Sequence, residues 1–140
     1  MEEYKIWRNT YRLISRELHL KIGSWNESLL TNQDVEFFCK VQLQASKIIY
    51  CKTILVYYRV NLSSITQSKK TIEKLSSELA SYKLYETHLG EKLLTEEAKR
   101  AIGYNYLKFI YHNDSNNKDL TKIAWSYFYS LNLGKPWGVG

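Results

Sequence analysis

The chain has 140 residues, of which 44% are hydrophobic and 14% aromatic, and its formal net charge is +6. This length suits a single domain with a real core, and the hydrophobic fraction argues against intrinsic disorder. The positive charge invites a nucleic-acid or anionic-membrane interpretation, but basic residues alternate with acids, as over 69–78, so a solvated helix face is favoured.

Cysteine and histidine are too sparse to predict a metal site. Cys39 and Cys51 have no metal-ligand spacing, and the three histidines lie far apart in the sequence. We expect the histidines, His88 among them, to be surface or half-buried residues without a partner. Nothing indicates a disulfide framework, a signal peptide or an apolar run of the ~20 residues that a membrane span needs. The expected location is therefore cytoplasmic, with peripheral membrane contact left open.

Two helices are predicted in the first third of the chain. The first begins after Ser15, a favourable N-cap, and ends at Gly23, a residue suited to the position that follows a helix. A polar loop over 24–31 comes next. The second helix extends from Gln33 to about Ser46, because its apolar residues recur at roughly helical spacing.

The start of this second helix carries its most distinctive residues. Thr31 or Asn32 can cap the helix, and Thr31 with Asp34 has the spacing of a capping box. The helix dipole favours an anionic side chain in the first turn by ~0.3–1 kcal/mol. Asp34 is therefore the leading candidate for chemistry, whereas Glu36 faces elsewhere on the helix and is expected to be solvated.

Two strands are predicted next, over 48–51 and 54–60. Both runs are rich in β-branched and aromatic residues, and a tight two-residue link joins them. Two strands are too few for a stable sheet, so we expect them to belong to a larger sheet with an open edge.

The second half of the chain is predicted to be helical. The apolar spacing over 69–89 is that of an amphipathic helix, Thr95 caps another helix, and a third covers 118–131. The change in composition divides the chain into a helix-loop-helix-strand-strand unit over 1–67 and a three-helix extension over 68–140. The predicted fold class is α+β, mostly helical.

Several of these features form one combined pattern: a helix that ends in Gly, an aromatic loop, an acidic motif at the start of an aromatic-rich helix, and two strands that end in Tyr-Arg. The residues concerned are Gly23, Trp25-Asn26-Glu27-Ser28-Leu29, Asn32-Gln33-Asp34, Glu36-Phe37-Phe38 and Val56-Tyr57-Tyr58-Arg59, followed by Ser63-Ser64. The run from Leu13 to Arg59, about a third of the chain, resembles the C-terminal half of family 2 glycosyltransferases with the GT-A fold. The resemblance implies that 1–67 is the acceptor side of a partial GT-A catalytic unit.

This resemblance implies an inverting transfer of a sugar from a nucleotide-sugar donor to an acceptor hydroxyl. Asp34 would act as the general base that takes the proton from the attacking hydroxyl. The acceptor would be bound by Trp25, Asn26, Glu27 and Gln33, with Trp25 stacked on a sugar face. Arg59, Ser63 and Ser64 would approach the donor phosphates, because arginine binds phosphate bidentately.

The sequence also departs from the family pattern. It contains no metal-binding Asp-x-Asp motif and no counterpart of the N-terminal nucleotide-binding half, and Gln33 stands where the family often has Glu. We therefore expect a fragment or truncated relative that is inactive alone and holds no cofactor, although a complete family member would use a divalent cation. The expected partners are a nucleotide-sugar, a carbohydrate or lipid-linked acceptor, and a second copy or another chain at the open sheet edge. Nucleic acid is not expected.

Each candidate residue has a structural alternative. Asp34 could be a helix-capping acid, Trp25 a core anchor, and Arg59 a surface residue in an ion pair. The alternative functions are a non-catalytic helical interaction module and a basic module that binds anionic surfaces. Binding that falls steeply with salt would be typical of the last class.

Overall fold

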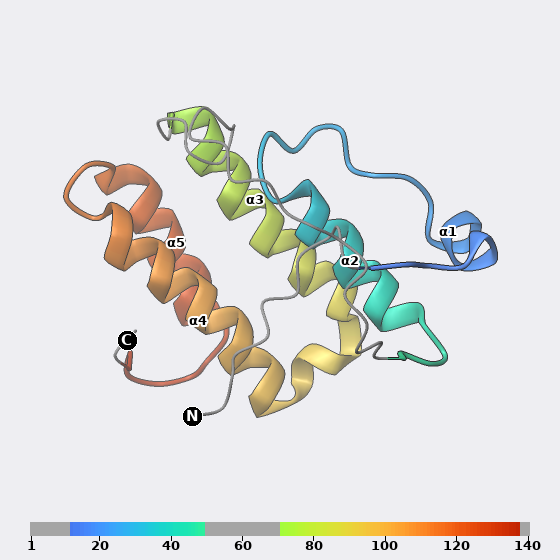
Figure 1. Cartoon of the computed structure of the whole chain (residues 1–140). Coiled ribbons are helices and arrows are strands. Elements are labelled where there is room, and N and C mark those ends of the chain that lie inside the picture. Colours follow the sequence, from blue (N-terminus) through green and yellow to red (C-terminus); the bar gives the residue numbers. More distant parts are fainter. Residues whose placement is uncertain (1–11, 50–70, 138–140) are drawn as a thin grey trace, which may run out of the picture.

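The computed structural model describes residues 12–49 and 71–137, and within these ranges the chain is helical (Figure 1). The described elements are the helices α1 (Arg16–Ile22), α2 (Gln33–Gln44), α3 (Ile72–Leu89), α4 (Glu96–Asn113) and α5 (Lys118–Ser130), with the short 3-10 helix η3 (Gly90–Leu94) between α3 and α4.

Local sequence sets most of the helix ends. At the start of α1 the hydroxyl of Ser15 accepts a hydrogen bond from the N–H of Leu18 at 3.1 Å. Thr71 and Thr95 cap α3 and α4 in the same way. Gly23 follows α1 with φ 80°, a conformation that glycine adopts without strain. The predicted ends at Ser15, Gly23 and Thr95 are thus confirmed.

The start of α2 differs from its prediction. Asn32 occupies the N-cap position with φ 62°, but its side chain makes no cap and instead donates to Ser81 on α3 at 3.2 Å. The hydroxyl of Thr31 likewise donates to the carbonyl of Lys74 at 3.2 Å. The predicted capping box is wrong because both side chains bind α3 rather than their own helix.

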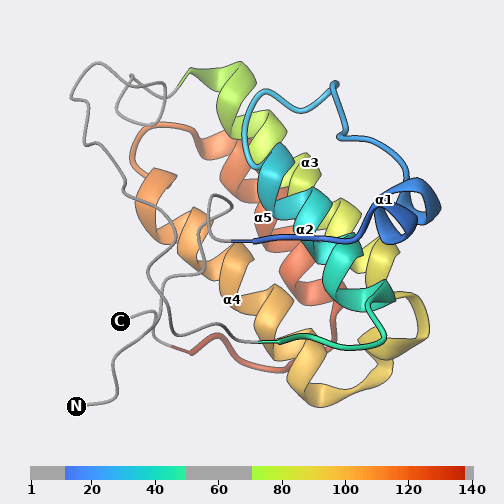
Figure 2. The same cartoon turned by 45° about the vertical axis from the view of Figure 1, so that its right-hand side comes forward.

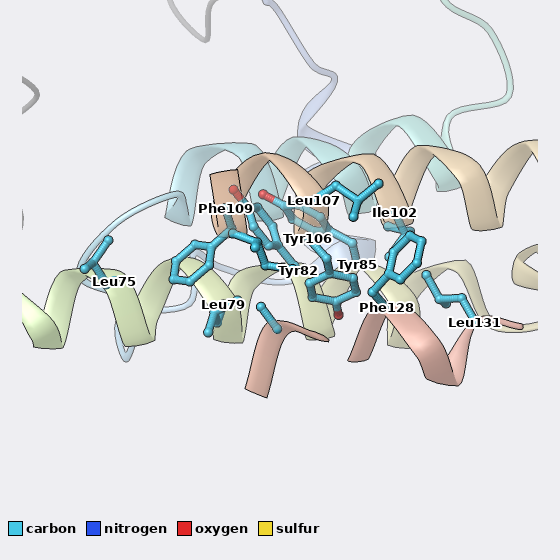
Figure 3. Close-up of a cluster of buried hydrophobic side chains, with 12 residues drawn as sticks. Leu75, Leu79, Tyr82, Tyr85, Ile102, Tyr106, Leu107, Phe109, Phe128 and Leu131 are labelled. Atoms are coloured by element: carbon cyan, nitrogen blue, oxygen red, sulfur yellow. The ribbon is translucent and has the colours of Figure 1, made fainter. Parts of the chain in front are cut away.

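Helices α3, α4 and α5 pack around the main hydrophobic core (Figure 3). Tyr106, Ala124 and Phe128 are fully buried in it. Helices α4 and α5 form a hairpin, and the segment after α5 returns across α4, where Leu133 and Trp137 lie against Gly103. The core residues labelled in the figure are Leu75, Leu79, Tyr82, Tyr85, Ile102, Tyr106, Leu107, Phe109, Phe128 and Leu131.

Helix α2 lies along α3, and α1 lies on the far side of α2 from the α4–α5 hairpin (Figures 1 and 2). Between α1 and α2 is a second, smaller cluster, in which Phe37, Phe38 and Val41 are buried. The partly buried Ile14, Leu18 and Ile22 cover that cluster, and α1 itself has no buried residue. Helix α1 is therefore a thin cover over one face of α2.

The predicted α+β fold class is wrong. The described ranges contain helices and no strand, so the predicted helix-strand-strand unit is not present there. Ile48 and Ile49, the first residues of the predicted strand pair, are irregular and 59% and 76% exposed. β-Branched residues favour a strand only where another strand pairs with them, and the described residues provide none. The rest of that pair and the predicted boundary at residue 67 lie outside the described residues.

Within 12–49 and 71–137, no helix combines the length and the apolar character needed to cross a bilayer.

Candidate functional site

The loop that precedes α2 is fixed to α3 by backbone hydrogen bonds. The hydroxyl of Ser77 accepts from the N–H groups of Leu30 and Thr31 at 2.8 and 3.2 Å. Ser77 is buried, and Leu29 beside the contact is 7% exposed. These contacts hold the loop and the first turn of α2 in one position relative to α3.

Trp25 lies over the aromatic pair of α2. Its ring stacks on Phe37 with a centroid separation of 4.8 Å and an interplanar angle of 8°, and it meets Phe38 edge-on at 6.3 Å. The residue is nevertheless 42% exposed. One ring face is therefore covered by Phe37, and the exposed remainder of the indole is open to a ligand.

Asp34 lies half-buried in the first turn of α2, where its Oδ1 accepts from the N–H of Val35 at 2.9 Å. Phe38 is one turn further along, so the two side chains share a face of the helix. The guanidinium of Arg12 lies 4.5 Å from the Phe38 ring centroid. Burial lowers the pKa of Arg12, and the negative charge of Asp34 acts in the opposite direction. Asp34, Arg12 and Trp25 are thus gathered around one aromatic pair.

The remaining predicted site residues have simpler surroundings. Asn26 shapes the loop, because its Oδ1 accepts from the N–H and the hydroxyl of Ser28 at 3.1 and 2.6 Å. Glu27 is exposed and Gln33 is half-buried. The predicted phosphate-binding residues Arg59, Ser63 and Ser64 lie outside the described residues.

A hollow of about 430 Å³ adjoins this aromatic pair. The segment before α1, the end of α2 and residues 45–49 form its walls, and Arg12 and Phe38 belong to its lining, whereas Asp34 does not. Its volume lies within the range of about 300–1,000 Å³ that is typical of small-ligand sites. The hollow begins one helical turn from Asp34.

Glu36 is a buried carboxylate that the sequence prediction missed. It is 2% exposed, and its Oε1 lies 2.5 Å from Nε2 of His88 and 3.5 Å from Nζ of Lys40. Its Oε2 is buried and accepts no hydrogen bond from the residues that the structure describes. The expectation of a solvated Glu36 is therefore wrong, and His88 is half-buried as expected but has a partner in Glu36.

The α3 side of this contact has a signal in the sequence, although the signal does not identify Glu36 as the partner. Ser77, Ser81, Tyr85 and His88 recur at spacings of three and four within an otherwise apolar face, so they form one polar stripe. The loop before α2 binds Ser77, Asn32 binds Ser81, and Glu36 binds His88. Because these contacts advance in the same direction on both helices, α2 and α3 run parallel.

Burial also raises the pKa of two side chains near Glu36, those of Cys39 and Tyr85. It raises the pKa of the Cys39 thiol, and the Glu36 carboxylate raises it further. Burial likewise raises the pKa of Tyr85 to about 12. A thiol with a raised pKa is a poor nucleophile at neutral pH. Among the described residues, no group of three or more His, Cys, Asp or Glu side chains could hold a metal ion.

The described residues define a helical protein whose candidate site is the Trp25–Asp34 face of α2. The comparisons with protein families, curated proteins and solved structures found no match to the chain.

Proposed function

We propose that this chain supplies the acceptor side of a sugar-transferring enzyme, with Asp34 as the general base. The observation that carries the proposal is the position of a half-buried carboxylate and a partly exposed tryptophan around the same aromatic pair of α2. The proposal depends on these residues and on the resemblance of the run from Leu13 to Arg59, and it does not depend on a sheet.

Trp25 supplies the platform for the acceptor. Its contact with Phe37 holds the indole plane fixed, so little side-chain freedom is lost when a sugar ring stacks on the open part. Asn26 holds the loop in shape through Ser28. Glu27 lies two residues after Trp25 in the same loop and is exposed. Its carboxylate is therefore the nearby group that can accept hydrogen bonds from sugar hydroxyls.

Asp34 supplies the base. In the proposed step, the acceptor oxygen attacks the anomeric carbon of the donor sugar while its proton moves to the Asp34 carboxylate. The bond from the anomeric carbon to the nucleoside diphosphate breaks, and that group leaves with the electron pair. The N–H of Val35 holds one oxygen of the Asp34 carboxylate in place.

A transfer assay tests this role. The chain is fused to, or mixed with, the nucleotide-binding half of a family 2 glycosyltransferase, and release of nucleoside diphosphate is measured with a panel of sugar acceptors. Loss of a general base lowers the rate by roughly 10²–10⁴-fold, so Asp34→Asn is expected to fall in that range. Asp119→Asn is the matched control, because Asp119 is an exposed acid in the first turn of α5. Equal rates for wild type and Asp34→Asn contradict the proposal.

A second candidate is a helical interaction module, favoured by the exposed apolar residues around α1. Leu13 and Leu20 are 91% and 70% exposed, and Ile48 and Ile49 lie at the adjacent hollow. Contiguous exposed apolar surface is typical of protein contacts. A chain that binds no sugar but self-associates, and becomes monomeric with Leu13→Ser and Leu20→Ser, would support this candidate over the first.

A further inference from the structure

The outward face of α4 carries cationic and aromatic side chains in alternation. Arg100, Tyr104, Lys108 and Tyr111 recur at spacings of three and four, so they share one face of the helix. We call these four residues the α4 face. The opposite side of α4 is buried in the main core, which fixes the direction in which the α4 face points.

The α4 face is exposed and basic. Tyr111 is 70% and Tyr104 is 37% exposed, although tyrosine in a folded protein is usually more buried. No Asp or Glu occurs between Ala98 and Asn113 in the sequence. Within the described part of the chain, Arg100 and Lys108 form no ion pair. Over its whole length α4 carries the basic residues Lys99, Arg100 and Lys108 and the acids Glu96 and Glu97, so its balance is basic by one charge.

Aromatic and acidic groups both lie beside the α4 face. Arg100 lies over the ring of Trp137, 5.7 Å from its centroid, which adds a third aromatic side chain at one end. At the other end Glu78 and Lys108 line the same hollow, so one acid lies beside the face there, and its carboxylate accepts from the hydroxyl of Tyr82 at 2.8 Å. The first turn of α4 holds Glu96 and Glu97, four and three residues before Arg100, and Glu96 pairs with Lys99 at 3.9 Å.

We propose that the α4 face binds an anionic lipid bilayer surface. Tyrosine and tryptophan rings settle at the level of lipid headgroups, while arginine and lysine extend their charged ends to the phosphates. The outward side of a helix is convex, and a convex side can rest on a broad surface such as a bilayer. Proteins that bind a single nucleic-acid strand instead follow it with a basic groove. This binding is independent of the proposed sugar transfer, because none of its residues belongs to the Trp25–Asp34 face.

Vesicle co-sedimentation of the whole chain tests the proposal. The vesicles are phosphatidylcholine alone or mixed with phosphatidylglycerol, and a single-stranded oligonucleotide is the competing probe. Each basic residue near an anionic bilayer strengthens binding about 5-fold, so Arg100→Gln with Lys108→Gln is expected to weaken it about 30-fold. Arg16→Gln with Lys21→Gln removes the same charge from exposed positions on α1, far from α4 (Figure 1), and is expected to change it much less.

The aromatic part of the α4 face has its own test. Tyr104→Ser with Tyr111→Ser keeps the charge and is expected to weaken binding several-fold, with the helical circular dichroism unchanged because both residues are exposed. Three results would overturn the proposal. These are binding that does not require phosphatidylglycerol, equal losses for the α4 and α1 charge variants, and binding of the oligonucleotide in preference to the anionic vesicles.

Discussion

The burial of Glu36 has an energetic consequence that depends on two other side chains. His88 and Lys40 are the groups that contact its carboxylate, and one carboxylate oxygen lacks a hydrogen bond within the described residues. Removing one partner of a buried pair is costly because the other is left buried and uncompensated. The contact between Glu36 and His88 therefore joins α2 to α3, and the two residues do not contribute to stability independently.

His88→Ala is expected to lower the free energy of unfolding by about 2–4 kcal/mol, since it leaves the Glu36 carboxylate buried with Lys40 alone. Glu36→Gln removes the charge together with its requirement for a partner, so it is expected to cost less. Urea denaturation followed by circular dichroism measures both. His112→Ala, an exposed histidine on α4, is the control and is expected to stay within about 0.5 kcal/mol of wild type. A His88→Ala variant as stable as this control would mean that Glu36 does not rely on the pair.

At the scale of elements, the contact between the loop and α3 sets the position of the candidate site. Two backbone N–H groups share the Ser77 hydroxyl, and Ser77→Ala leaves both without that acceptor. We expect a loss of about 1–3 kcal/mol and faster hydrogen exchange at Leu30 and Thr31. Ser76→Ala is the adjacent control, because Ser76 is exposed on the same helix. Unchanged exchange at Leu30 in Ser77→Ala would contradict the proposed anchoring.

The crossing of the C-terminal segment over α4 depends on Gly103. A Cβ at this position would lie 2.7 Å from Cδ1 of Leu133 and 3.3 Å from the fully buried ring of Phe128. Alanine normally favours a helix by about 1 kcal/mol over glycine. Here we expect Gly103→Ala to destabilise the protein instead, by about 1–3 kcal/mol, because the site is already filled.

Thermal or urea unfolding measures the effect of Gly103→Ala, and Leu133→Ala in the same chain provides the check. Removing the Leu133 side chain takes away the closest contact, so the double variant is expected to lose less than the sum of the two single variants. Strict additivity would mean that the alanine methyl group and Leu133 do not compete for the same space.

For the whole molecule, short-range sequence signals predicted the helices, whereas the contacts between them were not predictable in the same way. Ser15 and Thr95 were identifiable as caps because their hydrogen-bond partners lie three residues away. Glu36 and His88 are 52 residues apart, and no local pattern pairs them. The strand prediction at Ile48 is wrong because β-branched residues form a strand only where a neighbouring strand pairs with them.

The candidate site was predictable only in part, for the same reason. The first-turn position of Asp34 and the resemblance of the run from Leu13 to Arg59 indicate Asp34 and Trp25, but they do not indicate that Trp25 stacks on Phe37. No sequence pattern indicates Arg12, although it lies against Phe38. Its approach depends on how the segment before α1 returns across α2, which is a tertiary contact.

An NMR titration of the whole chain with a panel of oligosaccharides is the decisive test of the claim that the Trp25–Asp34 face of α2 binds sugar. We expect at least one sugar to shift the Trp25 indole N–H and the Asp34 amide together, in a saturable way, and Trp25→Ala to abolish the effect. Shifts confined to other helices, or no saturable shift at Trp25 with any sugar, would contradict the claim.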